Sequence, residues 1–198
     1  VQSPEQAVQL ATARTEAERL HRFVGNLLDM VRIEAGALHR SIEPVDLGEA
    51  VASVVQDLRG VLEDHPAKVE IAADLPFVLV DPQLFHHCLI NLIENASKYG
   101  PTGSPVTIAA FRDADGIVLT VKDEGPGIPE GQEERIFETF ARIEGSDRKG
   151  GTGLGLAIVK GFAEAMGLAV SASNRAECQG ACFTIRFDDS QLREWNEQ

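Results

Sequence analysis

An unbroken helical stripe over residues 3–35 constrains the fold of this chain more than any other feature. No proline follows Pro4 in this segment, and apolar residues recur at spacings of three and four, which places them on one helical face. They are Leu20, Phe23, Val24, Leu27, Leu28, Val31 and Ala35. Gly36 then supplies a helix stop. A helix of roughly 30 residues is too long for the interior of a small domain. We therefore predict a helix that binds a partner, with folding back onto its own domain as the alternative.

The rest of the sequence mixes helices and strands without strict alternation. Asp46 and Glu49 form a capping pair, and Asp81-Pro82 is a second helix start. Helices are predicted over 47–62, 82–99 and 154–166. Strands are predicted over 39–45, 68–72, 77–80, 106–111, 117–121, 169–173 and 182–187, with a hairpin at 106–121. We therefore predict an α+β fold, a two-layer α/β sandwich whose mixed sheet carries helices on one face, preceded by the long helix.

Charge limits the ligands of this chain. Its 198 residues include 31 Asp and Glu against 18 Lys and Arg, a formal net charge of −13. Extended binding to nucleic acid needs a basic surface and is not expected. An anionic ligand must be held locally, by backbone N–H groups, a few cations or a metal. No apolar run reaches the roughly 20 residues of a membrane span, so we expect no membrane contact by this segment. The cysteines Cys88, Cys178 and Cys182 are interpreted as reduced thiols with a packing role.

Polar residues share one face of the predicted helix 82–99. They are His87, Asn91, Glu94, Asn95 and Lys98, and the opposite face carries Phe85, Cys88, Leu89, Leu92 and Ala96, which we assign to the core. Asparagine is a weak helix former, so two of them on a solvated face are unusual. Two amides with a carboxylate suit magnesium, which takes oxygen ligands. A plain surface face is the alternative.

Two glycine-bearing segments follow. The first, Asp123-Glu124-Gly125-Pro126-Gly127-Ile128-Pro129, ends a strand and is either a tight turn or a site in which the Asp123 carboxylate accepts from an exocyclic amino group of adenine. The second, 150–156, runs into a helix whose free N–H groups favour phosphate. Leu156 stands where the dinucleotide-binding pattern needs glycine, and no Gly-x-x-x-x-Gly-Lys-Ser/Thr run is present. Rossmann and P-loop assignments are therefore excluded.

The order and spacing of these segments resemble one family. Residues 91–98 resemble its N box, 123–127 its G1 box and 151–155 its G2 box, and Phe137 and Phe140 resemble its F box. This family is the catalytic, ATP-binding domain of sensor histidine kinases, with the Bergerat fold. The resemblance covers about residues 40–188, and 26–36 is similar to the second helix of the family's dimerisation domain. The sequences around the N box, the F box and Gly180-Ala181-Cys182-Phe183 are similar to those of the potassium-responsive KdpD-type sensor kinases.

The resemblance implies a role for each matching residue. Asn95 would hold magnesium, supported by Asn91, and Glu94 would be the general base or polarising group. Asp123 would read the adenine amino group, and Lys98, Arg142 and Lys149 would neutralise phosphate. The implied ATP-binding residues are Asn91, Asn95, Lys98, Tyr99, Asp123, Gly125, Gly127, Ile128, Phe137, Phe140, Arg142, Gly151, Thr152, Gly153, Leu154, Gly155 and Leu156. Catalysis of phosphoryl transfer would rest on positioning of the reacting groups and neutralisation of the phosphate charge.

Two departures from the family pattern stand out. No histidine here has the context of the family's phosphoacceptor, so the acceptor is expected on a helix absent from this chain. Ala181 and Cys182 stand where many relatives have a threonine near adenine. The expected organisation is residues 1–36 as half of a dimerisation domain, 37–190 as the catalytic domain and 191–198 as a tail.

The family implies a cytoplasmic location, at the cytosolic end of a membrane-bound bacterial sensor. Expected partners are ATP, the protein's own dimerisation domain and a response regulator, with a homodimer in the intact protein. The alternatives are another Bergerat-fold ATPase or serine kinase, or a nucleotide-binding or dimerisation module without catalysis.

Overall fold

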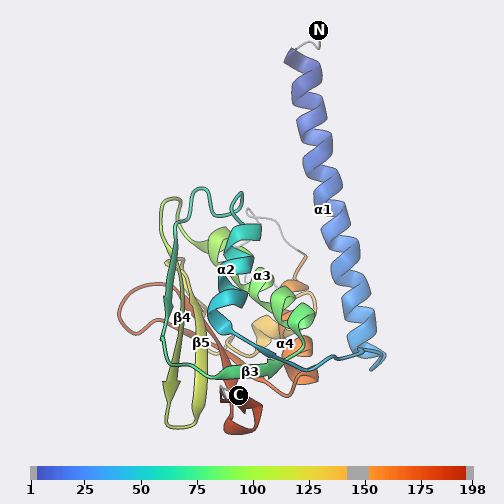
Figure 1. Ribbon diagram of the computed structural model, residues 1–198. Helices are drawn as coiled ribbons and strands as arrows, with labels where there is room; N and C mark the ends of the chain where they lie inside the picture. The colour runs from blue at the N-terminus through green and yellow to red at the C-terminus, as the bar shows by residue number, and fades with distance from the viewer. Residues whose placement is uncertain (1–3, 142–151, 195–198) are drawn as a thin grey trace.

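The computed structural model describes residues 4–141 and 152–194 (Figure 1). The helices are α1 (Pro4–Glu34), α2 (Leu47–Asp57), α3 (Pro82–Tyr99) and α4 (Gly155–Ala165), with short 3₁₀ turns η1 (Arg135–Phe137) and η3 (Asp189–Gln191). The strands are β1 (Glu43–Val45), β2 (Ala67–Ile71), β3 (Phe77–Val80), β4 (Val106–Asp113), β5 (Gly116–Lys122), β6 (Ala169–Asn174), β7 (Ala181–Phe187) and β8 (Leu192–Arg193).

The main sheet has five strands in the order β2-β4-β5-β7-β6. β2 runs parallel to β4, and every other neighbouring pair is antiparallel, so the predicted mixed sheet is confirmed. The predicted hairpin is β4–β5, which closes with Asp113 opposite Gly116. Strands β1, β3 and β8 form a second, antiparallel sheet. The sequence did not predict β8 or this small sheet.

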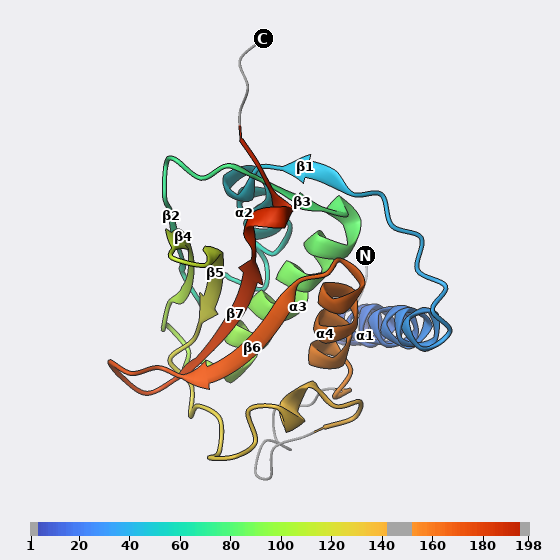
Figure 2. The ribbon, with the colours of Figure 1, turned by 90° about the horizontal axis from the view of Figure 1, so that it is seen from below.

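Helices α2, α3 and α4 cover one face of the five-stranded sheet, as Figures 1 and 2 show. The predicted core face of α3 is confirmed, because all five of its apolar residues are buried. Phe85 of α3 meets Phe187 of β7 edge to face, with ring centroids 5.8 Å apart. Cys88 lies on the same face, and burial raises the pKa of its thiol. The predicted packing role therefore describes Cys88, whereas Cys178 is exposed.

Two predicted elements are shorter in the structure. The helix predicted over 47–62 ends at Asp57, and residues 58–64 form turns. Gly60 interrupts the helical run, while Leu58 and Leu62 stay buried through the turns. The strand predicted over 39–45 pairs only from Glu43. The first difference follows from Gly60, and the second from the end of the partner strand β3 at Val80, which lies opposite Glu43.

Helix α1 projects away from the sandwich and contacts it through its last turns (Figure 1). Ile33 packs against Gly161 of α4, where a Cβ atom would lie 2.7 Å from the Ile33 Cδ1 atom. Asp29 Oδ2 lies 3.7 Å from His87 Nδ1 of α3. Leu20, Leu28 and Val31 remain exposed on the stripe. Folding back therefore describes only the end of α1. Within residues 4–141 and 152–194, no helix has the length and apolarity for a transmembrane span.

Candidate functional site

Asn91 is the first residue of the candidate site on the polar face of α3. Its Nδ2 atom donates to the main-chain oxygen of His87, one turn earlier, at 2.9 Å. This bond turns the side-chain oxygen outward, toward the start of α4. A Cβ atom at Gly155 would lie 2.9 Å from Asn91 Oδ1, so glycine at 155 lets the start of α4 approach this oxygen without displacing it. The N box and the G2 box therefore meet at Asn91 and Gly155.

This meeting point has a donor set that fits a hard divalent cation. Asn91 Oδ1 has a fixed direction, and Asn95 lies half-buried one turn further along the same face. Glu94 is half-buried beside it. Carboxylate and amide oxygens are the protein ligands that magnesium prefers. The start of α4 adds main-chain N–H groups that favour phosphate.

The end of α3 carries a cation and an aromatic ring. Lys98 Nζ donates to the Tyr99 hydroxyl at 3.2 Å and lies 4.8 Å from the centre of that ring. The main-chain oxygen of Tyr99 would lie 2.7 Å from a Cβ atom at Gly125. Glycine at 125 thus lets the loop after β5 pass directly over the end of the helix.

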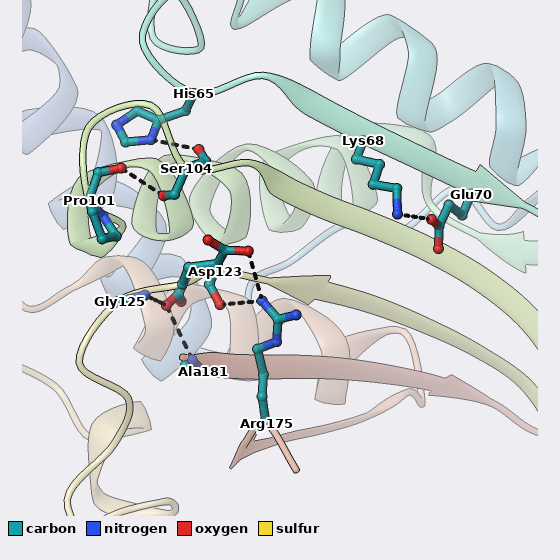
Figure 3. Close-up of polar contacts among 10 residues, drawn as sticks. His65, Lys68, Glu70, Pro101, Ser104, Asp123, Gly125, Arg175 and Ala181 are labelled. Atoms are coloured by element: carbon teal, nitrogen blue, oxygen red, sulfur yellow. Dashed lines mark hydrogen bonds and ion pairs between the residues drawn. The ribbon is translucent and has the colours of Figure 1, made fainter. Parts of the chain in front are cut away.

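Asp123 stands at the end of β5 with its carboxylate fixed by the main chain. Its Oδ1 atom accepts from Gly125 N at 2.7 Å and from Ala181 N at 3.2 Å (Figure 3). The residue is only 3% exposed. The predicted Asp123, Gly125, Gly127 and Ile128 all belong to this one loop. A carboxylate held in a single direction is suited to recognising a donor group on a planar ligand.

Asn174 at the end of β6 and Arg175 in the turn that follows hold the same loop, and the sequence analysis missed both. Asn174 Oδ1 accepts from Ile128 N at 2.7 Å, and its Nδ2 donates to Ile128 O at 2.8 Å. Arg175 Nη1 donates to the main-chain oxygen of Asp123 at 3.0 Å and lies 3.8 Å from Glu124 Oε1. An asparagine is disfavoured inside strands, so its place at the end of β6 was a local signal of a turn.

The other predicted residues lie around the start of α4. Thr152 Oγ1 accepts from Leu154 N at 3.3 Å, and Gly153, at a φ of +69°, accepts through its carbonyl from Phe140 N at 2.9 Å. Leu154 is buried and Leu156 packs against the core. Phe137 is buried with its ring edge to face against Phe183, whereas Phe140 is 60% exposed. Arg142, Lys149 and Gly151 lie outside the described residues.

Helix α3 thus joins two parts of the candidate site. Tyr99 contacts the Asp123 loop, and Asn91 contacts the start of α4. Eight residues separate these contacts, which corresponds to about 12 Å of helix. This arrangement suits an elongated ligand with a planar group at the carboxylate and an anionic group at the start of α4.

Comparison with known proteins agrees with this arrangement. The family model of histidine kinase-, DNA gyrase B- and HSP90-like ATPases matches residues 80–191. Sensor protein KdpD of Escherichia coli is 37% identical over 191 residues, which cover 96% of this chain and 21% of that protein. The adaptive-response sensory kinase SasA of Nostoc sp. is 36% identical over 152 residues, which cover 75% of this chain and 38% of that protein. The chain therefore spans about a fifth of the length of KdpD.

Solved structures give the same relationship. Full-length ShkA in complex with AMPPNP superposes with a TM-score of 0.78 at 29% identity, over 93% of this chain and 39% of ShkA. The mycobacterial sensor histidine kinase MprB superposes with a TM-score of 0.65 at 29% identity, over 73% of this chain and 95% of that one. The α+β architecture predicted from the sequence is the one these proteins share.

Proposed function

The chain belongs to the family of histidine kinase-, DNA gyrase B- and HSP90-like ATPases, as the catalytic module of a sensor histidine kinase, and from this premise we propose that it phosphorylates a histidine outside this chain. In this reaction the bond between the γ-phosphorus of ATP and its bridging oxygen breaks. A bond from phosphorus to the histidine nitrogen forms, and ADP leaves.

The main support for ATP as the substrate is the fixed carboxylate of Asp123. Two main-chain N–H groups orient its Oδ1 atom at the end of a rigid strand. A carboxylate can only accept hydrogen bonds, and adenine offers an exocyclic amino group. Guanine presents a carbonyl oxygen at the equivalent position, which a carboxylate repels. Asp123 therefore selects adenine over guanine, and Gly125 and Gly127 let the loop lie flat against the base.

The middle of α3, around Asn91, receives the phosphates. Asn95 and Asn91 would hold magnesium through their side-chain oxygens, and this metal supplies charge neutralisation on the phosphates. Glu94 lies on the same face and accepts or polarises the N–H proton of the acceptor imidazole while the other ring nitrogen attacks phosphorus. Lys98 adds a cation near the other end of that face. The start of α4 binds phosphate through main-chain N–H groups.

The acceptor histidine lies outside the chain in this proposal, and the histidines of α3 support that assignment. His86 Nε2 lies 3.1 Å from Asp57 Oδ2, which links α3 to α2. His87 contacts Asp29, and its ring centre lies 6.1 Å from that of Phe162. Both therefore act in packing between helices. The acceptor belongs to a dimerisation domain that α1 completes, and a response regulator receives the phosphoryl group. We further propose that the intact protein is a homodimer. This segment would then lie at the cytosolic end of a membrane-bound sensor.

Calorimetric titration of the 198-residue chain with ATP, with and without magnesium, tests the proposal. GTP serves as the matched control, because it differs from ATP at the base and keeps the triphosphate. We expect magnesium-dependent binding that prefers ATP. Transfer of the γ-phosphoryl group to a supplied acceptor domain then tests catalysis. Equal affinity for ATP and GTP would contradict the role of Asp123, and binding of neither nucleotide would contradict the proposed function.

A further inference from the structure

The segment 174–181, from the end of β6 through the turn to the start of β7, holds the loop 123–128 at both ends. At one end Ala181 donates its N–H to the Asp123 carboxylate, and Asp123 N–H donates to the Ala181 carbonyl at 3.1 Å. Arg175 holds the Asp123 carbonyl from the same side. A Cβ atom at Gly180 would overlap that carbonyl, so the turn and the strand end fit closely.

At the other end the contact is a side-chain amide. Asn174 accepts from the N–H of Ile128 and donates to its carbonyl, so one side chain satisfies both main-chain groups of one residue. Gly127 has a φ of +80°, and a Cβ atom there would lie 2.5 Å from Asn174 Oδ1. The glycine and the amide therefore fit each other, and no larger residue at 127 would leave this pairing intact.

These two attachments enclose the flexible part of the loop. Gly125 and Gly127 have the widest backbone freedom in it, and Pro126 lies between them. If only the Asp123 end were held, the segment beyond Gly125 could rotate away from the carboxylate. The two hydrogen bonds between the Asn174 side chain and the Ile128 main chain prevent this rotation. They keep Ile128 in the core, where it is 5% exposed. Asn174 itself is on the surface of the molecule.

We propose that Asn174 is a positioning residue for adenine recognition, which acts through the main chain of Ile128 and needs no contact with the nucleotide. The inference rests on the proposed function, because the loop that Asn174 holds is the one that carries Asp123. The inference predicts that loss of the two hydrogen bonds between Asn174 and Ile128 weakens recognition of the amino group of the base more than binding of the phosphates.

The test compares ATP with purine riboside triphosphate, which lacks the exocyclic amino group. Dissociation constants are measured by calorimetry, with magnesium, on the wild-type 198-residue chain and on Asn174→Ala. We expect the wild type to prefer ATP. Asn174→Ala should bind ATP about 10-fold more weakly, in line with the loss of a hydrogen bond to a charged group from Asp123. Its affinity for purine riboside triphosphate should change much less, so the preference for ATP falls.

Two further variants make the outcome decisive. Asn174→Asp keeps an acceptor for Ile128 N–H and loses the donor, so its preference for ATP should lie between those of the wild type and Asn174→Ala. This variant decides the question if thermal melting shows that Asn174→Ala does not fold. Ser173→Ala removes an exposed hydroxyl from the preceding position of β6 and should keep the wild-type preference.

Failure of the inference and failure of the proposed function give different results. A wild-type chain that prefers ATP, with an unchanged preference in folded Asn174→Ala, would overturn the inference alone. An equal reduction of both affinities in Asn174→Ala would also overturn it, because a purely structural role acts on both ligands. A wild-type chain that does not distinguish the two triphosphates would overturn both the assignment of Asp123 and the inference.

Discussion

Ile33 of α1 occupies the space that a side chain at Gly161 of α4 would need. A Cβ atom at position 161 would lie 2.7 Å from Ile33 Cδ1 and 2.8 Å from Ile33 Cγ2. This contact joins the end of the long helix to the sandwich, and Figure 2 shows α1 end-on beside α4. The missing side chain at 161 is therefore a requirement of the packing between the two helices.

The contact reverses the usual effect of a glycine-to-alanine change in a helix. Such a change ordinarily stabilises by about 0.5–1 kcal/mol. For Gly161→Ala we expect the free energy of unfolding to fall by about 1–3 kcal/mol, because the new methyl group overpacks against Ile33. Urea denaturation measures the change. In the Ile33→Ala background the same substitution should become neutral or stabilising. A stabilised Gly161→Ala variant with Ile33 intact would refute the contact.

Local signals predicted the start of α3 at Pro82, and the reason lies in its first residues. Asp81 accepts from the main-chain N–H groups of Gln83 and Leu84 at 3.0 Å, and Pro82 occupies the first turn. These are signals that a helix start carries in its own sequence. The order of the glycine-bearing segments likewise predicted the Asp123 loop and the start of α4.

The contacts that the sequence did not predict join residues far apart in the chain. Asn174 and Ile128 are 46 positions apart, and their pairing follows from the place of β6 at the sheet edge. Asn91 and Gly155 meet only because α3 packs on α4. The sequence identified Gly155 from its segment, but its contact with the Asn91 oxygen needed the fold. In both pairs, the sequence around one residue does not indicate which residue it contacts.

Asn95→Ala should abolish phosphoryl transfer and leave the fold intact. Asn95 is half-buried on the polar face of α3, and alanine is the best helix former, so the helix should persist. Loss of a metal ligand removes several kcal/mol of transition-state stabilisation, and we expect a rate at least about 100-fold lower. Single-turnover transfer to a supplied acceptor domain measures this rate, and thermal melting controls for folding. An unchanged rate would rule out the magnesium role of Asn95.

Asp123→Asn should weaken binding of ATP more than binding of magnesium. The amide oxygen can replace Asp123 Oδ1 in accepting from Gly125 and Ala181. The second oxygen then becomes an NH₂ group, which cannot accept from the adenine amino group. We expect ATP to bind roughly 10- to 100-fold more weakly, as for a lost hydrogen bond to a charged group. Competition between ATP and GTP measures the change. An ATP affinity equal to that of the wild type would show that Asp123 does not read the base.

The ion pair between Asp113 and Arg186 should make the free energy of unfolding depend on pH in the acid range. Arg186 Nη1 donates to both carboxylate oxygens of Asp113, at 3.0 and 2.8 Å, and this hydrogen bonding lowers the pKa of Asp113 in the folded chain. The unfolded chain therefore binds a proton first as pH falls. The stabilising contribution is complete above the ordinary pKa of an aspartate and disappears as pH falls through the lowered folded value.

Urea denaturation of the wild type and Asp113→Asn, from about pH 6 to about pH 2, measures this contribution. The difference in the free energy of unfolding should be greatest near neutral pH and shrink toward acid. It should remain small, because the pair is exposed to solvent and screened. Arg186→Met is the matched control: in that background the pH-dependent effect of Asp113→Asn should be smaller and limited to the part due to main-chain donors such as Asp115 N, which donates to Asp113 Oδ1 at 2.9 Å. A difference that grew as pH fell would show that the Asp113 carboxylate is destabilised by folding, which is the opposite of what its contact with Arg186 requires.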